Sequence, residues 1–220
     1  MLGSSDAKDQ KRACELFRRA AEHDFAASQY RLGYCYESGS GVEQDFSVAN
    51  EWYEKAAMQG YVDAQYKLGH SYRVGRGTEI DLPVALRWFT LAAENGDKEA
   101  QHNVGWMYAT GQGTEPRPKE AFNWFLRAAQ NGEEGSQFEV ARRLKDGDGV
   151  GKDLVASFAW LLVLEAQKKD FDPKSWESVQ GLLKMVEREL DDSQRSSAKR
   201  LSQEWLVMLA KTYIAKLALP

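Results

Sequence analysis

Few residues in this chain could carry out chemistry, and their spacing does not suit catalysis. The 220 residues include three histidines, His23, His70 and His102, and none has another histidine or a cysteine at a metal-binding spacing. Asp146 and Asp148 could flank a sugar bond, but short acidic loops are common in solvated turns. The Gly-x-Gly sequences lack the Lys-Ser/Thr pair of a phosphate-binding loop, and no serine stands in a nucleophile elbow. We therefore predict no catalytic residue, no metal site and no cofactor.

These few candidates lie within a sequence that repeats itself every 36 residues. A tryptophan, a pair of alanines, a Leu-Gly pair and two glycines separated by one residue keep their places in successive copies. The tryptophans are Trp52, Trp88, Trp124 and Trp160, and the second glycines are Gly41, Gly77, Gly113 and Gly149. A fixed period of roughly 20 to 50 residues is typical of proteins built from stacked structural units.

Each copy has room for two helices. Small and apolar residues recur at spacings of three and four, which places them on one face of an α-helix. One stripe has Ala49, Trp52, Tyr53, Ala56 and Ala57, and the other has Ala64, Leu68, Gly69 and Tyr72. Gly60 and the couple Gly75 and Gly77 follow these stripes, where a left-handed residue can end a helix. We predict repeats over 7–167: one helix at 7–22, then hairpins at 26–58, 62–94, 98–130 and 134–167.

The repeated pattern A-x-x-W-[YF]-x-x-A-A-x-x-G…A-Q-Y-x-L-G-x-x-Y-x-x-G-x-G is nearly complete at 49–77 and 85–113. It is less complete at 13–41 and 121–149. The pattern resembles the Sel1-like repeat family, relatives of the tetratricopeptide repeat, over about three quarters of the chain. The resemblance implies an all-α fold, a right-handed superhelical solenoid of helix hairpins. It also implies that the protein functions by binding rather than by catalysis.

The period is lost after Lys168-Lys169-Asp170. Asp172 and Pro173 then suit the capping and first positions of a new helix. Its apolar stripe, and that of a last helix from about Ser193, contain Trp176, Val179, Leu182, Leu183, Val186 and Leu190, then Ala198, Leu201, Trp205, Met208 and Leu209. We predict that 172–218 is a two-helix cap on the last hairpin, because the end faces of solenoids are otherwise apolar. A device for homodimerisation through the terminal helices is the alternative.

Composition and charge exclude several functional classes. The net charge is only -4, with 28% charged and 43% hydrophobic residues, so no basic face for nucleic acid is expected. No run of 18 apolar residues suggests a membrane span, and 1–10 lacks the apolar segment of a secretory signal. We expect a soluble chain, cytoplasmic, or periplasmic or secreted if an upstream segment was removed. The lone helix at 7–22 further suggests a piece of a longer array.

The chain has two cysteines, Cys14 and Cys35, on different expected helices. Some members of the resembled family link each hairpin with a disulfide, and their cysteines recur from copy to copy. Here the positions 36 residues on are Asn50 and Ser71. We therefore favour two free, packed thiols, and keep a single bridge in an oxidising compartment as the alternative.

The first helix of each hairpin carries the candidate binding residues. By analogy with tetratricopeptide units, positions two before, two after and five after the Leu of the Leu-Gly pair face a concave groove. These are Tyr30, Tyr34 and Glu37; Tyr66, His70 and Arg73; His102, Trp106 and Ala109; and Phe138, Arg142 and Lys145. Aromatic residues and arginine dominate binding hot spots. Tyr30, Tyr66 and Phe138 share one repeat position, so packing between helices is the alternative interpretation for that column.

Two functions from different classes fit these expectations. The first is a non-catalytic adaptor or scaffold that binds a peptide or protein segment in the groove. The alternative is a cell-envelope module that binds peptidoglycan or another glycan, where Tyr34 and Trp106 would stack on sugar rings. An enzyme is the third and least supported hypothesis.

Overall fold

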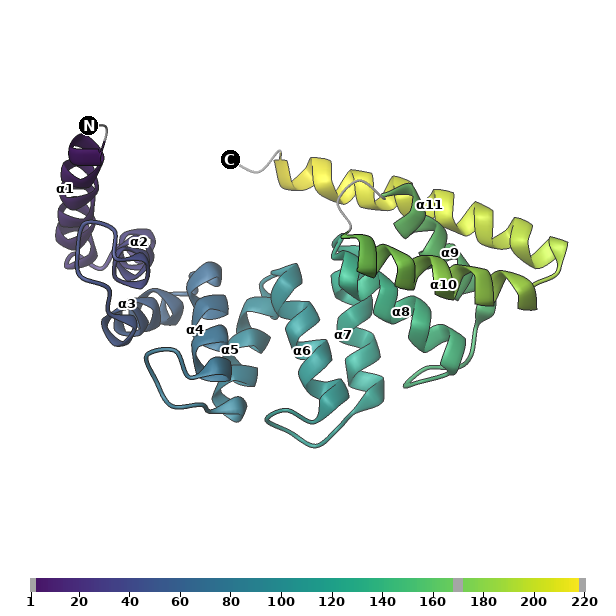
Figure 1. Cartoon of the computed structure of the whole chain (residues 1–220). Coiled ribbons are helices and arrows are strands. Elements are labelled where there is room, and N and C mark those ends of the chain that lie inside the picture. Colours follow the sequence, from purple (N-terminus) through teal and green to yellow (C-terminus); the bar gives the residue numbers. More distant parts are fainter. Residues whose placement is uncertain (1–2, 168–171, 218–220) are drawn as a thin grey trace. The chain divides into compact units, whose positions relative to one another are not determined.

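The computed structural model describes residues 3–167 and 172–217, which form eleven α-helices and no strand. The all-α repeat of helix hairpins predicted from the sequence is confirmed (Figure 1). The helices are α1 Gly3–Ala21, α2 Ala26–Ser38, α3 Phe46–Met58, α4 Val62–Val74, α5 Leu82–Glu94, α6 Lys98–Thr110, α7 Pro118–Gln130, α8 Glu134–Asp146, α9 Leu154–Ala166, α10 Pro173–Glu189 and α11 Asp192–Leu217.

The chain forms two compact units. The first unit comprises Met1–Ala100 and Gln112–Thr114, and so holds α1 to α5. The second unit comprises Gln101–Gly111 and Glu115–Pro220, and holds most of α6 and all of α7 to α11. In the first unit, each of α1 to α4 packs against the next helix along the chain. In the second unit, α7 packs against α8, and α8, α10 and α11 all pack against α9.

Capping residues fix where the second helices of the hairpins begin. Asp45, Asp81 and Asp153 each accept hydrogen bonds from backbone N–H groups of the helix that follows. Such a bond satisfies a donor that has no partner inside the helix. At the corresponding place in the remaining hairpin, Arg117 makes no side-chain cap, and Pro118 starts the helix instead. The 36-residue period therefore sets the helix starts directly.

Small residues in the first helices let aromatic rings of the second helices come close. The contacting pairs are Gly33 with Tyr53, Gly69 with Phe89, and Gly105 with Phe125. A Cβ at any of these glycines would lie 2.6 to 2.8 Å from the ring. In the last copy Ala141 and Leu161 take the two places, and both are fully buried. The smaller Leu161 side chain leaves room for the alanine methyl group, so the two departures from the repeat compensate each other.

A buried glutamine on each first helix ties neighbouring helices together. The side-chain Nε2 of Gln29 and Gln65 donates to the carbonyl oxygens of Ala21 and Ala57, at 3.3 and 3.2 Å. Their side-chain oxygens accept hydrogen bonds from Gln59 at 2.7 Å and from Asn95 at 3.5 Å. The repeated glutamine therefore places a polar group that satisfies buried backbone.

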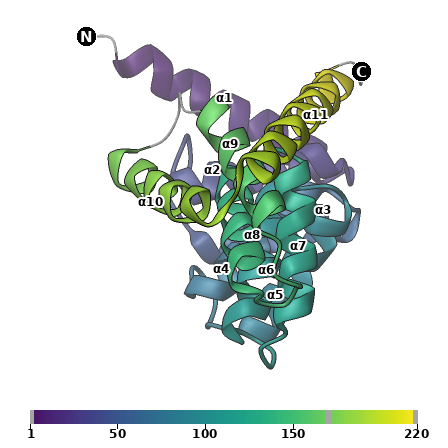
Figure 2. The same ribbon diagram turned by 90° about the vertical axis from the view of Figure 1, so that its right-hand side faces the viewer.

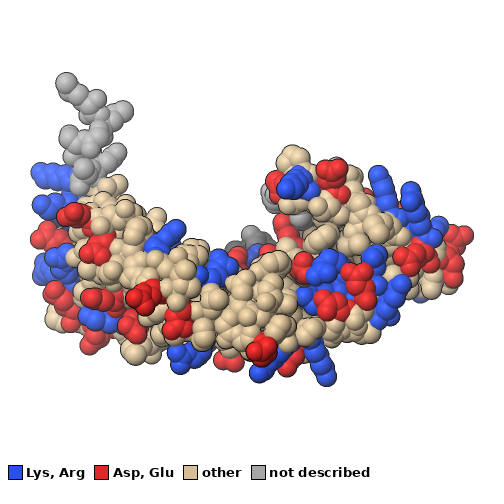
Figure 3. Space-filling view, turned by 60° about the horizontal axis from the view of Figure 1, so that its bottom comes forward, with Lys and Arg blue, Asp and Glu red and all other residues tan. Residues whose placement is uncertain are grey.

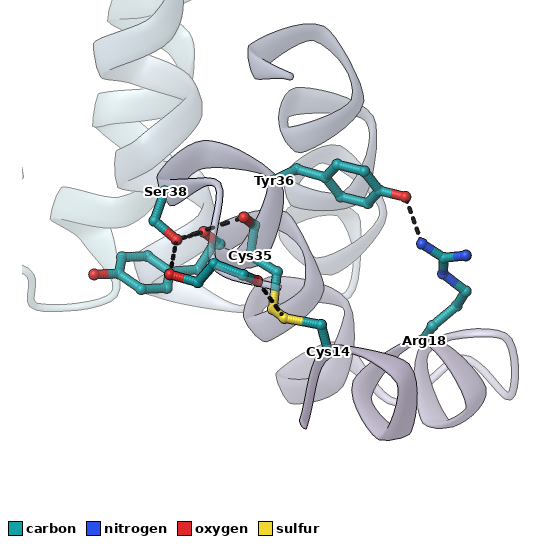
Figure 4. Close-up of a disulfide and its surroundings, with 7 residues drawn as sticks. Cys14, Arg18, Cys35, Tyr36 and Ser38 are labelled. Carbon is teal, nitrogen blue, oxygen red and sulfur yellow. Dashed lines mark hydrogen bonds between the residues drawn. A yellow bond between two sulfur atoms is a disulfide. The ribbon is translucent and has the colours of Figure 1, made fainter. Parts of the chain in front are cut away.

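Cys14 of α1 and Cys35 of α2 form a disulfide, so the favoured prediction of two free thiols is wrong (Figure 4). The packing of α1 against α2 brings the two Cα atoms to 6.2 Å, within the span of a disulfide. Recurrence in other copies was the wrong criterion, because the bridge needs only this one helix pair. Arg18 also donates to the Tyr36 hydroxyl at 2.7 Å between the same helices.

In the second unit, α10 and α11 flank α9 and pack against it (Figure 2). Trp160 of α9 stacks on Trp205 of α11, with ring centroids 4.5 Å apart. Val179, Val186 and Leu209 from the two C-terminal helices are buried in the same core. The role of 172–218 as a cap rather than a dimer contact stays a prediction, and residue 218 lies outside the described residues. The contacts explain why α9 is apolar nearly all round.

Candidate functional site

A pocket of about 260 Å³ lies in the first unit between α2, α3, α4 and the loop after α4. We call it the α2–α4 pocket. Three of the predicted binding residues line it: Glu37, Tyr66 and His70. Lys67 and Arg76 line it as well, and neither was among the predicted residues. Three of the binding residues predicted in the first unit therefore lie together in a concave, charged pocket.

Glu37 is the centre of the polar contacts in this pocket. Lys67 Nζ lies 3.0 and 2.9 Å from the two carboxylate oxygens of Glu37, and the Tyr53 hydroxyl donates to the same carboxylate. The Arg76 guanidinium lies 3.8 Å from one of these oxygens. Burial raises the pKa of Glu37, but the hydrogen bonds from Lys67 and Tyr53 outweigh burial, so the pKa is lowered overall. The Glu37 carboxylate is thus ionised and held in place at neutral pH.

The cations of the pocket are held on aromatic rings. The Arg76 guanidinium lies 5.4 Å from the ring centroid of Phe46, and Asn50 donates to the Arg76 carbonyl oxygen at 2.8 Å. Lys67 Nζ lies 5.8 Å from the ring of Tyr34, which is 48% exposed. Cation–π contacts restrict where a flexible cation can lie. Tyr34 therefore contacts a cation of the pocket but does not line the pocket itself.

His70 lines this pocket but adds no positive charge to it. Burial lowers the pKa of His70, and the charges of Arg73, Arg76 and Lys67 lower it further. His70 is therefore neutral at pH 7 and cannot offset the carboxylate. The Arg73 guanidinium lies 5.8 Å from the ring of Phe89.

Packing between helices is the alternative interpretation for Tyr30, Tyr66 and Phe138, and all three side chains pack against neighbouring residues. Tyr30 contacts Tyr53 and Tyr61, with centroids 5.6 and 5.0 Å apart, and Tyr66 contacts Phe89 at 5.6 Å. In the second unit, Phe138 packs partly buried against the core. All three side chains are half-buried, so little of their surface is open to a partner.

His102 of α6 belongs to a polar cluster that sequence reasoning missed. Its Nδ1 lies 2.8 Å from Ser136 Oγ and 3.1 Å from a Glu133 oxygen, and its ring contacts Phe125 at 5.5 Å. Glu133 also caps α8 by accepting from the N–H groups of Gly135 and Ser136. A catalytic triad needs serine and carboxylate on opposite ring nitrogens, whereas both meet Nδ1 here, and Ser136 is fully buried. The cluster is a helix cap and offers no nucleophile.

Because Glu133 caps α8 as a carboxylate, the stability of the folded chain should decrease at acid pH. Burial raises the pKa of Glu133, but hydrogen bonds from His102 and Ser136 lower it to about 2, against 4.5 ordinarily. Its stabilising effect is therefore present above pH 4.5 and is lost as the pH falls towards 2. We expect E133Q to cost about 2 kcal/mol at pH 7, measured by urea unfolding, and nearly nothing near pH 2.

The control for this prediction is E120Q. Glu120 lies exposed in the first turn of α7, so its loss should change stability by less than about 0.5 kcal/mol at either pH. An equal cost of E133Q at neutral and acid pH would contradict the prediction.

The remaining second-unit candidates differ in how far they are already paired. Trp106 is 42% exposed on α6. Arg142 lies 2.7 Å from Glu139 and 3.8 Å from Asp146, and Lys145 lies 2.9 Å from Asp146. The sequence contained the signal for the two pairs of Arg142, because acidic residues three before and four after a cation share its helix face. The charges of Arg142 and Lys145 are therefore largely neutralised by carboxylates of their own helix.

Among the described residues, no group of three or more His, Cys, Asp or Glu side chains could hold a metal ion. None of the helices described is both long and apolar enough to cross a bilayer. Acidic and basic side chains are interspersed on the face shown in Figure 3.

Comparisons with known proteins agree on one repeat family. The sequence matches the family model described as Sel1 repeat at 2–25, 26–61, 62–97, 98–133 and 135–162. The crystal structure of a Sel1 repeat protein from Oxalobacter formigenes is similar, with 28% identity, a TM-score of 0.69, and coverage of 90% of this chain and 76% of that one.

A second similar structure is a protective antigen of uropathogenic Escherichia coli strains that displays an SLR fold. It has 25% identity and a TM-score of 0.56, and the match covers 94% of this chain. The present chain spans about half of that protein, 51% of its length. No curated protein matches the sequence.

Proposed function

Because the chain belongs to the Sel1 repeat family, we propose that it is a non-catalytic adaptor that binds a segment of a partner protein on the first helices of its hairpins. The observation that carries the proposal is the exposure of two large aromatic side chains. Tyr34 on α2 and Trp106 on α6 hold the same repeat position and are 48% and 42% exposed. Partly exposed aromatics with charged neighbours are typical anchors of protein interfaces.

The surroundings of these rings support binding at low entropic cost. Each ring stands on a helix whose other face is buried, so the backbone that carries it is already ordered. A preformed surface loses little conformational freedom when it binds. The Sel1 repeat family is generally one of interaction modules. A role in binding also fits the cluster of His102, Glu133 and Ser136, which serves as a helix cap.

A glycan-binding module of the cell envelope is the second candidate. The disulfide between Cys14 and Cys35 favours an oxidising compartment, where such a module would work. Tyr34 and Trp106 would then stack on sugar rings. Retention on purified cell-wall material, compared with capture of a protein from lysate, separates the two candidates.

The experiment that tests the adaptor proposal is site-specific photo-crosslinking. A benzophenone amino acid replaces Tyr34 or Trp106, and Leu91 is the control position. Leu91 is also 42% exposed, but it lies on a second helix, α5. We expect one protein to be crosslinked from 34 and from 106 and not from 91. Equal crosslinking from all three positions would contradict the proposal.

A further inference from the structure

We propose that the α2–α4 pocket is a binding site for a carboxylate of the partner segment, and that Glu37 occupies this site until the partner arrives. The ligand would be an acidic side chain that takes the place of Glu37 between Lys67 and Arg76. This inference rests on the proposed adaptor function and names the chemistry that one part of the binding face recognises.

The pocket already shows how it holds a carboxylate. Lys67 reaches both oxygens of Glu37, at 3.0 and 2.9 Å, and Arg76 approaches at 3.8 Å. About 260 Å³ remains open beside these groups. A water molecule takes roughly 30 Å³ of liquid, so an incoming carboxylate and its methylene stem have room.

The charges around the pocket do not balance. Among the residues that line it, Glu37 is the only carboxylate, whereas Lys67 and Arg76 are both cations. Two cations therefore face one anion, and the surplus positive charge attracts a second carboxylate.

Both cations can be reached from solvent and are held in place. The side chains of Lys67 and Arg76 are 28% and 46% exposed. The loop that carries Arg76 is fixed by hydrogen bonds from Ser47 and Asn50 to its carbonyl oxygens, at 3.1 and 2.8 Å. A partner would therefore meet ordered cations, which lowers the entropic cost of binding.

Glu37 can give up the cations without being left unpaired. The Tyr53 hydroxyl donates to its carboxylate from the opposite helix, α3, and that bond can remain after Lys67 and Arg76 turn to a ligand. The arrangement is also not part of the repeat. The positions 36 residues after Glu37, Lys67 and Arg76 are Arg73, Asn103 and Gln112, so the fold does not require this set of charges.

The test is an NMR titration of the full chain with blocked tetraglutamate, compared with blocked tetraglutamine. We expect saturable shifts of the Lys67 and Arg76 amide signals with tetraglutamate only. E37Q should bind it about threefold to tenfold more tightly, and K67Q about tenfold more weakly. The control is K55Q, because Lys55 also lies over a ring, that of Trp52 at 4.0 Å, but outside the pocket; its affinity should equal that of the unmodified chain.

Three outcomes would overturn the inference: E37Q binding more weakly or unchanged, K55Q losing as much as K67Q, or no shift at the pocket amides. If E37Q does not fold, the comparison of K67Q with K55Q still decides. Failure here is separate from failure of the adaptor function, because Trp106 belongs to the second unit and does not line this pocket, so crosslinking from position 106 does not depend on it.

Discussion

Replacing Gly77 by alanine is expected to destabilise the chain by about 4 kcal/mol, which combines backbone strain with a steric clash. Gly77 has φ +68, and a Cβ there would lie 2.3 Å from the carbonyl carbon of Phe46 at the start of α3. Backbone at a helix start cannot move aside as a flexible side chain can. We expect urea unfolding of G77A to show this loss in the first unit.

G60A is the matched control for this prediction. Gly60 also has a positive φ, +84, but nothing lies within 4 Å of the Cβ that alanine would add. Its cost should be the strain alone, about 1 kcal/mol. Equal costs for G60A and G77A would contradict the idea that the loop after α4 is locked onto α3.

Removing the disulfide between Cys14 and Cys35 is expected to cost about 3 kcal/mol, since the bridge closes a loop of moderate length and restricts the unfolded chain. The two cysteines are 21 residues apart. We expect a reductant to lower the urea midpoint of the unmodified chain. The C14S/C35S variant should start at that lower midpoint.

The same pair of proteins supplies the control. C14S/C35S has no cysteine left, so a reductant should not change its midpoint. If a reductant shifted both proteins equally, or neither, the bridge would not stabilise the α1–α2 pair.

The helix hairpins could be predicted from the sequence because each depends on residues close to one another in the chain. The hairpins expected at 26–58, 62–94, 98–130 and 134–167 begin and end within one residue of the helix pairs α2–α3, α4–α5, α6–α7 and α8–α9. The couple Gly75 and Gly77 was predicted to end a helix. Gly75 does end α4, whereas Gly77 makes a contact with α3 that no local pattern reveals.

The polar contacts of the site could be predicted only in part. Glu37 is predicted from the sequence as a binding residue facing the concave groove, but its contacts with Tyr53, Lys67 and Arg76 join positions 16 to 39 residues apart and need the packed helices. The partners of Arg142 were visible in the sequence, since they lie on its own helix. Contacts between residues far apart in the chain cannot be read from the sequence, whereas contacts within one helix can be predicted from the spacing of the residues.

The central claim is that the first helices bind the partner, and the affinity of W106A/R142A for the crosslinked partner tests it most directly. A hot spot of about 2 kcal/mol predicts at least a 30-fold loss of affinity. L91A, which removes an equally exposed side chain from α5, should bind within about twofold of the unmodified chain. Unchanged affinity of W106A/R142A, with its circular dichroism intact, would contradict the claim.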